Sequence, residues 1–256
     1  MALLIDAKEV TAVVRELVEG AQRVLGDEFV GAYVTGSLTT GEFDEASDID
    51  LVIVTRGELD DARFDALELM HEEISRKESR WATQVEVSYF PHADLRRYDP
   101  GRSLHPRLDR GKGERLKMMH HDSDWVAQRH MLREKGITLM GPDPKQLIDP
   151  VSPDELRDAM RPLLLDWIRP LLDERVPFAG RGHQAHIVLT VCRILYTMEH
   201  GEVVSKREAA DWAQENMHER WRPLIERAWL GRQSPSGPME DATETIAFIR
   251  QIVELM

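Results

Sequence analysis

Two aspartates, Asp48 and Asp50, stand at the start of the apolar run 51–54, separated only by Ile49. Alternate residues of a strand point to the same face, so both carboxylates project together while Ile49 points into the other layer. Two adjacent carboxylates repel each other unless a cation lies between them. Charge at the edge of a buried strand is costly unless it is paired or binds a metal. The spacing therefore predicts a cation site at the beginning of a buried strand.

A third carboxylate comes from the next predicted strand, Gln84–Phe90, whose alternation places Glu86 on the face opposite to its valines. If this strand pairs with the first, Glu86 joins Asp48 and Asp50. Carboxylates combined with phosphate oxygens suit Mg²⁺. Two such ions can hold both the attacking and the leaving oxygen of a phosphoryl displacement. The three acids therefore predict metal-assisted phosphoryl transfer, with all three as metal ligands.

A Gly-Ser pair, Gly36-Ser37, follows a predicted strand at 29–35. Glycine lets a backbone approach phosphate closely, and the serine offers a hydroxyl and an N–H. Ser47, next to Asp48, adds a second hydroxyl. The turn is not a P-loop, because the lysine of that motif is absent. A Gly-Ser turn or an Asp-x-Asp pair alone is common, but their combined order along the chain is far more specific and predicts a triphosphate site.

The elements that must position these residues divide at a proline-rich segment. Helical periodicity covers 6–25, 60–78 and 122–136, with the three predicted strands between the first two helices and after the second. Four prolines fall within 141–153, and Ser152 begins a new helix. Periodicity downstream is helical throughout. An α/β unit over 1–150 followed by an all-α helical unit over 151–256 is the predicted organisation.

The segment 91–117 shows no periodicity and is expected to be irregular. It carries eight basic residues: Arg96, Arg97, Arg102, Arg107, Arg110, Lys112, Arg115 and Lys117. A solvated loop and a surface that faces phosphate or substrate are both compatible with this pattern. The role of the basic segment 94–117 therefore stays open at this point.

Bulk properties exclude several classes of protein. A formal net charge of −13 argues against general nucleic-acid binding, which needs a basic face. The single cysteine, Cys192, excludes an internal disulfide and fits a reducing compartment. No apolar run approaches the roughly 20 residues that cross a bilayer. We expect a cytoplasmic protein, monomeric, with no nucleic-acid or membrane partner.

The order G-S-x(9)-S-D-I-D-L, followed by a strand glutamate, resembles the nucleotidyltransferase superfamily that includes DNA polymerase β. Two downstream stretches, TLMGPDPKQLIDPV at 138–151 and IVLTVCRILYTMEHGEVVSKREAADWA at 187–213, sharpen the resemblance. They are similar to the aminoglycoside (streptomycin/spectinomycin) adenylyltransferases, which have a C-terminal helical domain. The resemblance implies an α/β (α+β) nucleotidyltransferase domain with a small mixed sheet, followed by an all-α helical bundle domain.

The resemblance also implies a chemistry: ATP as co-substrate, two Mg²⁺ ions, and transfer of AMP to a hydroxyl of a small molecule bound between the two domains. It assigns roles to nine residues: the metal ligands Asp48 and Asp50, the catalytic base and metal ligand Glu86, and the nucleotide ligands Gly36, Ser37, Ser47, Asp124, Lys206 and Trp229.

The acceptor side departs from the family pattern. In that family an acidic pair before the V-L-T helix grips the ammonium groups of the drug, and here His183-Gln184 stand at those positions. The family tryptophan that packs on streptomycin has no aromatic counterpart in 113–121. An aminoglycoside such as streptomycin or spectinomycin is one candidate acceptor. A protein hydroxyl is a second, and a nucleotide-binding regulator without turnover is an alternative of another class.

Overall fold

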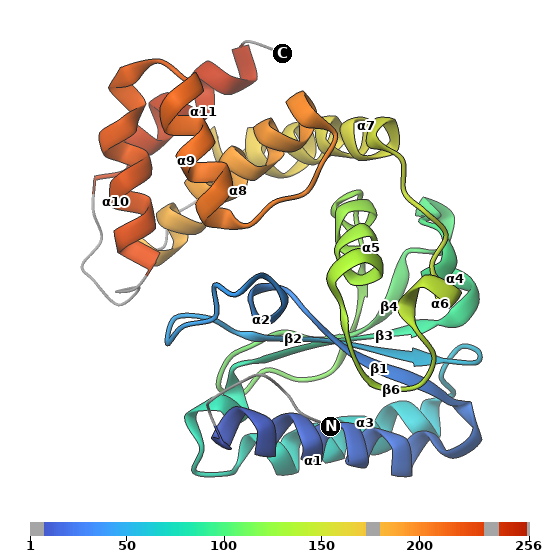
Figure 1. Ribbon diagram of the computed structural model, residues 1–256. Helices are drawn as coiled ribbons and strands as arrows, with labels where there is room; N and C mark the ends of the chain where they lie inside the picture. The colour runs from blue at the N-terminus through green and yellow to red at the C-terminus, as the bar shows by residue number, and fades with distance from the viewer. Residues whose placement is uncertain (1–7, 173–179, 233–240, 255–256) are drawn as a thin grey trace. The chain divides into compact units, whose positions relative to one another are not determined.

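The computed structural model describes residues 8–172, 180–232 and 241–254. The chain separates into two compact units. The first comprises Met1–Phe43 and Ser47–Pro150, and the second comprises Asp44–Ala46 and Val151–Met256. Figure 1 shows a sheet with helices in the first unit and helices alone in the second.

The first unit is built on a six-stranded mixed sheet with the strand order β5-β4-β3-β2-β1-β6. Its strands are β1 (Phe29–Thr35), β2 (Ile49–Thr55), β3 (Val85–Pro91), β4 (Leu104–Leu108), β5 (Lys117–His120) and β6 (Ile137–Met140). Strands β2 and β3 are parallel, and every other neighbouring pair is antiparallel. The predicted fold class, with its small mixed sheet, is confirmed.

Helices cover both faces of this sheet, as Figure 1 shows. Helices α1 (Lys8–Leu25) and α3 (Asp61–Ser75) lie on one face, where α3 is the crossover that a parallel pair of strands requires. Helices α4 (His92–Arg96), α5 (Asp124–Lys135) and α6 (Pro144–Leu147) lie on the other face. The strand alternation sends Leu51 and Val87 into the α1/α3 core and Val52 into the second core.

The segment expected to be irregular is partly ordered into strands. It contains α4, β4 and, at its end, the start of β5, and β6 after α5 was not predicted either. Strand β4 reads L-H-P-R-L, which shows no alternation and includes Pro106. Proline has no N–H to donate, and Pro106 pairs only with Met118 of β5, while the pairs with β3 begin at Arg107. These strands are held by partners distant in sequence, which local periodicity does not report.

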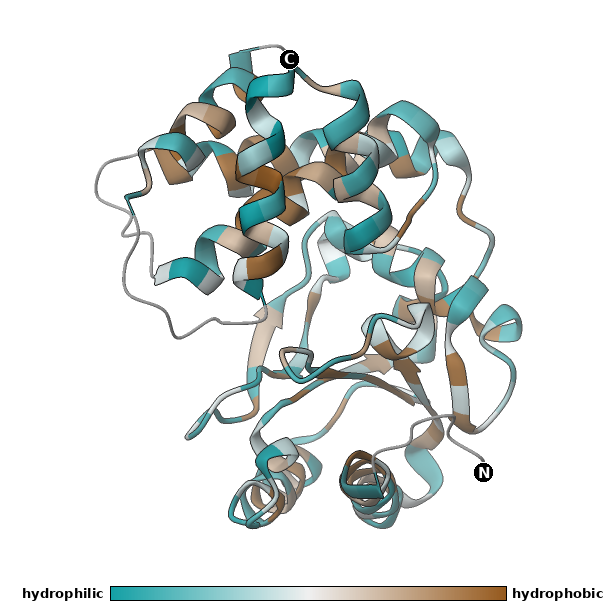
Figure 2. Cartoon of the chain, turned by 60° about the vertical axis from the view of Figure 1, so that its left-hand side comes forward, coloured by the Kyte–Doolittle hydropathy of each residue, from teal (hydrophilic) through white to brown (hydrophobic). Residues whose placement is uncertain are grey.

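Every secondary-structure element described in the second unit is helical. Its helices are α7 (Pro153–Leu163), α8 (Gly180–His200), α9 (Lys206–Asn216), α10 (Arg222–Arg232) and α11 (Thr243–Glu254), and a π turn with a 3₁₀ turn at 164–172 follows α7. Capping boxes start α7 at Ser152 and α9 at Ser205. Figure 2 shows apolar residues gathered where these helices cross. None of the described helices combines the length and apolarity that crossing a membrane requires.

Candidate active site

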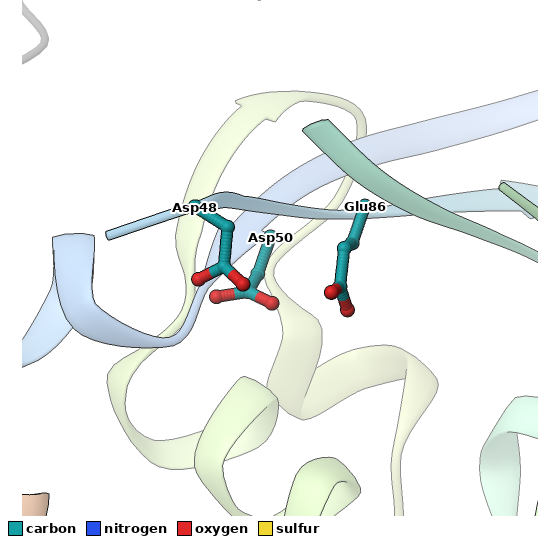
Figure 3. A group of neighbouring side chains, drawn as sticks. All are labelled: Asp48, Asp50 and Glu86. Carbon is teal, nitrogen blue, oxygen red and sulfur yellow. The ribbon is translucent and has the colours of Figure 1, made fainter. Parts of the chain in front are cut away.

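Three carboxylates meet at one end of the parallel pair β2–β3. The register places Asp50 of β2 directly opposite Glu86 of β3, and Asp48 comes just before β2. One carboxylate oxygen from each residue lies within 4.8 Å of the others, and all three residues are half-buried (Figure 3). The two strands pair, which is the condition under which Glu86 joins the two aspartates, and this pairing brings the three acids together.

The apolar residues between these acids hold them in place. Ile49 and Val85 lie on the opposite face, buried in the core under α1 and α3. The Ile49 N–H donates to the Gln84 carbonyl at 2.8 Å and so ties the start of β2 to the start of β3. Because the strand period is two, burying these neighbours leaves the polar face for Asp48, Asp50 and Glu86.

Gly36 and Ser37 lie directly against this acidic group. Gly36 adopts φ +68°, and a Cβ on it would lie 1.9 Å from Asp50 Oδ2, so any other residue here would be strained and would displace Asp50. Ser37 begins the short helix α2 (Ser37–Thr40), and its buried hydroxyl oxygen has no hydrogen-bond partner among the described residues. A buried hydroxyl without a partner needs an explanation, and a bound ligand oxygen would provide one. Ser47 is buried beside Asp48.

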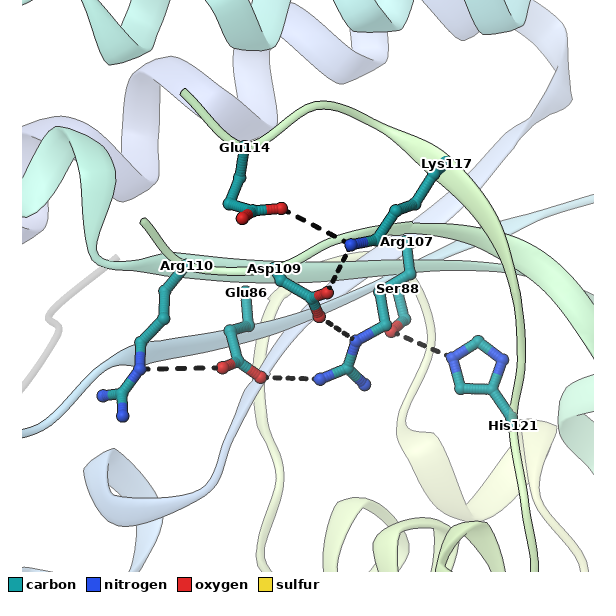
Figure 4. Close-up of polar contacts among 8 residues, drawn as sticks. All are labelled: Glu86, Ser88, Arg107, Asp109, Arg110, Glu114, Lys117 and His121. Atoms are coloured by element: carbon teal, nitrogen blue, oxygen red, sulfur yellow. Dashed lines mark hydrogen bonds and ion pairs between the residues drawn. The ribbon is translucent and has the colours of Figure 1, made fainter. Parts of the chain in front are cut away.

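Two arginines that the sequence analysis did not assign contact the acids. Arg107 Nη2 donates to Glu86 Oε2 at 2.7 Å. Arg110 Nη1 lies 3.0 Å from Asp48 Oδ2. Its Nε lies 3.9 Å from Glu86 Oε1, as Figure 4 shows. Both come from the segment 94–117, whose role the sequence left open. They were missed because β4, which contains Arg107 and leads to Arg110, carries no recognisable strand pattern.

A chain of ion pairs fixes Arg107 in turn. Its Nε donates to Asp109 Oδ1 at 2.8 Å, and Lys117 Nζ lies 2.9 Å from Asp109 Oδ2 (Figure 4). Most of the other basic residues of this segment pair away from the acids: Arg96 and Arg97 with Asp149, Arg102 with Asp94, and Arg115 with Glu68. The segment is therefore neither a free solvated loop nor a uniformly basic surface.

The surroundings raise the pKa of two carboxyl groups, those of Glu86 and Asp124. Burial raises the pKa of the Glu86 carboxyl, and the Asp48 carboxylate raises it further, while Arg107 and Arg110 act in the opposite direction. Burial raises the pKa of Asp124 to about 6, and Arg107 partly opposes this shift. Asp124, at the start of α5, and Glu86 are therefore both near enough to Arg107 to be affected by its charge.

The donor set fits Mg²⁺. Hard oxygen ligands on rigid strands, with room left for phosphate oxygens, are what this ion takes in proteins. The partnerless hydroxyl of Ser37 and the space that only glycine leaves at Gly36 lie beside the same acids. In the described part of the chain, no second group of histidine, cysteine and acidic side chains meets in this way.

The remaining predicted nucleotide ligands belong to the helical unit. Lys206 is the first residue of α9, directly after the capping Ser205. Trp229 in α10 has the guanidinium of Arg232 at 4.5 Å and that of Arg207 at 5.1 Å from its ring centre. Gln184, at a position where the family has an acid, is buried and accepts a hydrogen bond from the Thr245 hydroxyl at 3.0 Å. Its side chain therefore joins α8 to α11.

A mixed sheet that presents three carboxylates on two parallel strands, beside a Gly-Ser turn, defines the nucleotidyltransferase class. Residues 14–101 match the family model of the nucleotidyltransferase domain, and residues 146–255 match that of the aminoglycoside adenylyltransferase C-terminal domain.

Known proteins are similar to this chain over most of its length. An aminoglycoside (3'') (9) adenylyltransferase of Escherichia coli is 30% identical over 239 residues, which cover 88% of this chain and 87% of that protein. A spectinomycin 9-adenylyltransferase of Campylobacter jejuni is 24% identical over 242 residues, covering 91% and 88%. The chain belongs to the aminoglycoside adenylyltransferase family. The resemblance predicted from the sequence is confirmed, and the protein is a nucleotidyltransferase.

A solved structure shares the whole fold. The spectinomycin adenyltransferase AAD(9) from Enterococcus faecialis, solved with ATP and spectinomycin, superposes with a TM-score of 0.70. The match covers 95% of this chain and 99% of that one at 18% identity. At this level of identity the comparison establishes the common fold.

Proposed function

We propose that this protein transfers AMP from ATP to a hydroxyl group of a small molecule, with Asp48, Asp50 and Glu86 holding Mg²⁺. The observation that carries the proposal is the meeting of three carboxylate oxygens within 4.8 Å on two paired strands. The nucleotidyltransferase class of the family supports it. Two ions, as expected from the sequence, are our proposal for the metal content.

The residues of the first unit take defined parts in this reaction. Glu86 accepts the proton of the acceptor hydroxyl while the oxygen of that hydroxyl attacks the α-phosphorus of ATP. The bond from the α-phosphorus to the oxygen that links it to the β-phosphorus breaks, and pyrophosphate leaves with that oxygen. Gly36 allows the backbone to approach the triphosphate, and Ser37 and Ser47 offer it hydroxyls. Bound Mg²⁺ supplies neutralisation of the phosphate charge.

The helical unit contributes the other nucleotide ligands in this proposal. Lys206 pairs with phosphate, Trp229 stacks on the adenine, and Asp124 of the first unit helps to hold the nucleotide. The match of residues 146–255 to the family's C-terminal domain supports the assignments of Lys206 and Trp229. We further propose 1–150 as the nucleotidyltransferase domain, 151–256 as the helical domain, and a monomer in the cytoplasm as the working form.

The acceptor that we propose first is an aminoglycoside or spectinomycin-type compound, because similar proteins carry those names. The decisive experiment measures pyrophosphate release from ATP and Mg²⁺ with streptomycin, spectinomycin and a panel of hydroxylated metabolites. Mass spectrometry of the product should show one added adenylyl group. Release with no acceptor on the panel, together with label from ATP on a polypeptide in a lysate, would move the assignment to a protein hydroxyl.

Three variants test the site itself. We expect Asp48→Asn, Asp50→Asn and Glu86→Gln each to lower turnover by about 100-fold or more while circular dichroism shows an intact fold. Glu73→Gln, an exposed carboxylate on α3, is the matched control and should keep full turnover. Unchanged turnover in any of the three variants would remove that residue from the proposed machinery.

A further inference from the structure

The guanidinium of Arg110 lies between two of the three carboxylates. Its Nη1 is 3.0 Å from Asp48 Oδ2, and its Nε is 3.9 Å from Glu86 Oε1. We propose that Arg110 is the resident cation of the metal site, which compensates Asp48 and Glu86 when no metal is bound and is displaced when the metal enters. This inference rests on the proposed function, because it takes Asp48 and Glu86 as metal ligands.

Arg110 differs from Arg107 in how it is held. Arg107 lies on strand β4 opposite Ser88, and Asp109 binds its Nε as a second anchor. Arg110 lies beyond β4, and among the described residues its only ion pairs are those with Asp48 and Glu86. Its side chain is 43% exposed, against 25% for Arg107. Arg107 is therefore a fixed partner of Glu86, whereas Arg110 can leave.

The backbone beside Arg110 does not need to move for this exchange. The N–H of Gly111 donates to the Thr83 carbonyl at 2.8 Å, which ties the chain next to Arg110 to the segment that leads into β3. The flexible arginine side chain can rotate into solvent from this fixed point, because nearly half of it is already exposed. The displacement is a side-chain movement only.

The charges decide the direction of the exchange. When no metal is bound, the three carboxylates, whose oxygens lie within 4.8 Å of one another, repel each other. A nearby guanidinium relieves that repulsion. A divalent ion carries twice the charge, and it repels the guanidinium at such short range. Partly exposed ion pairs are weak, so displacing Arg110 should cost only about two- to fivefold in metal affinity. Arg110 thus keeps the empty site compensated at a small cost to metal binding.

Calorimetry with Mn²⁺ alone, without nucleotide or acceptor, tests how much Arg110 lowers the metal affinity. Arg110→Gln should bind Mn²⁺ about two- to fivefold more tightly than the unaltered protein. Arg115→Gln is the matched control, because Arg115 is close along the chain but pairs with Glu68. It should leave the affinity unchanged. Equal or weaker Mn²⁺ binding by Arg110→Gln, or equal tightening in both variants, would overturn the proposal.

The arginine side-chain N–H signals in NMR spectra test the displacement directly. The Nε–H signal of Arg110, assigned by its loss in Arg110→Gln, should shift as Mg²⁺ is added. The Nε–H of Arg107 points to Asp109 and should stay in place. An Arg110 signal that is unchanged at saturating Mg²⁺ would overturn the inference alone. A protein that binds neither Mg²⁺ nor Mn²⁺ would overturn both this inference and the proposed metal role of the acids.

Discussion

At the scale of the residue, the site depends on short distances between individual atoms. Asp50 contributes one of the three grouped carboxylates and also fills the space that a side chain at position 36 would need. Glu86 has its two oxygens near two different arginines. The site is therefore specified by small distances between a few groups, and changes of one methyl group or one charge should have measurable effects.

Gly36→Ala should disable the site. The new Cβ would lie 1.9 Å from Asp50 Oδ2, so Asp50 must turn away from the other acids. We expect at least about a tenfold loss of turnover, because misplacing a catalytic group by an ångström is that costly. Gly41→Ala is the matched control: Gly41 has φ +79° but nothing within 4 Å of a Cβ. That variant should lose about 1–2 kcal/mol of stability and keep its metal binding. Similar activity losses in both would point to strain instead of collision.

Asp124→Asn should change stability in a pH-dependent way. The pKa of Asp124 is raised to about 6 in the folded protein, so between its ordinary value and 6 only the folded state holds the proton. Stability of the unaltered protein therefore falls as pH rises through this window. The neutral asparagine escapes that loss. Urea unfolding should give similar stabilities near about pH 4 and a more stable variant above about pH 7. A difference that does not vary with pH would contradict the assignment.

At the scale of the element, the parallel pair β2–β3 and its crossover α3 position the acids. Glu86 lies on one face of β3, and the residues on the other face pack against α3. His71 of α3 and Tyr89 of β3 form a buried hydrogen bond of 2.7 Å between His71 Nε2 and the tyrosine hydroxyl. Burial lowers the pKa of His71 to about 4, so this histidine is neutral near pH 7.

Tyr89→Phe should weaken this connection without touching the chemistry. It leaves the buried His71 nitrogen without its partner, which costs about 1–3 kcal/mol of unfolding free energy. The KM for ATP should be unchanged, because Tyr89 faces away from Glu86. The double variant His71→Leu/Tyr89→Phe should lose less than the sum of the two single variants. Strict additivity in urea unfolding would show that the two side chains are not coupled.

At the scale of the whole molecule, the two compact units have separate sources of stability. The buried residues of α8 pack against α7, α9 and α10, all within the helical unit. Both of the capping boxes that begin α7 and α9 lie inside that unit as well. The helical unit thus has its own core and its own helix starts, as a domain that can fold alone should have.

A fragment of residues 151–256 should therefore fold by itself. We expect a helical circular dichroism spectrum and a single cooperative transition in urea. The fragment keeps Ser152 and the whole of its capping box with Glu155. The Ile187→Ala variant of the same fragment, which removes a fully buried side chain of α8, should lower its stability by about 2–5 kcal/mol. A fragment without cooperative unfolding would contradict the proposed division at residue 150.

The sequence by itself determined the features that depend on local pattern. The period of two placed Asp48 and Asp50 on one face, the alternation around Glu86 gave the third acid, and capping and prolines marked the change from sheet to helices near residue 150. Motifs that resemble those of a known family then indicated the nucleotidyltransferase class. These inferences needed only neighbours along the chain, whose geometry is fixed by the secondary structure they form.

Only the tertiary structure brought Arg107 and Arg110 against the acids and Asp50 against Gly36. Arg107 meets Glu86 across 21 positions of sequence, through a strand that contains proline and has no alternation. The close approach of Asp50 to Gly36 depends on how β1 and the turn after it lie beside β2. Contacts of this kind are set by strand order and register. Those arise from the burial and pairing of distant segments, and no local periodicity records them.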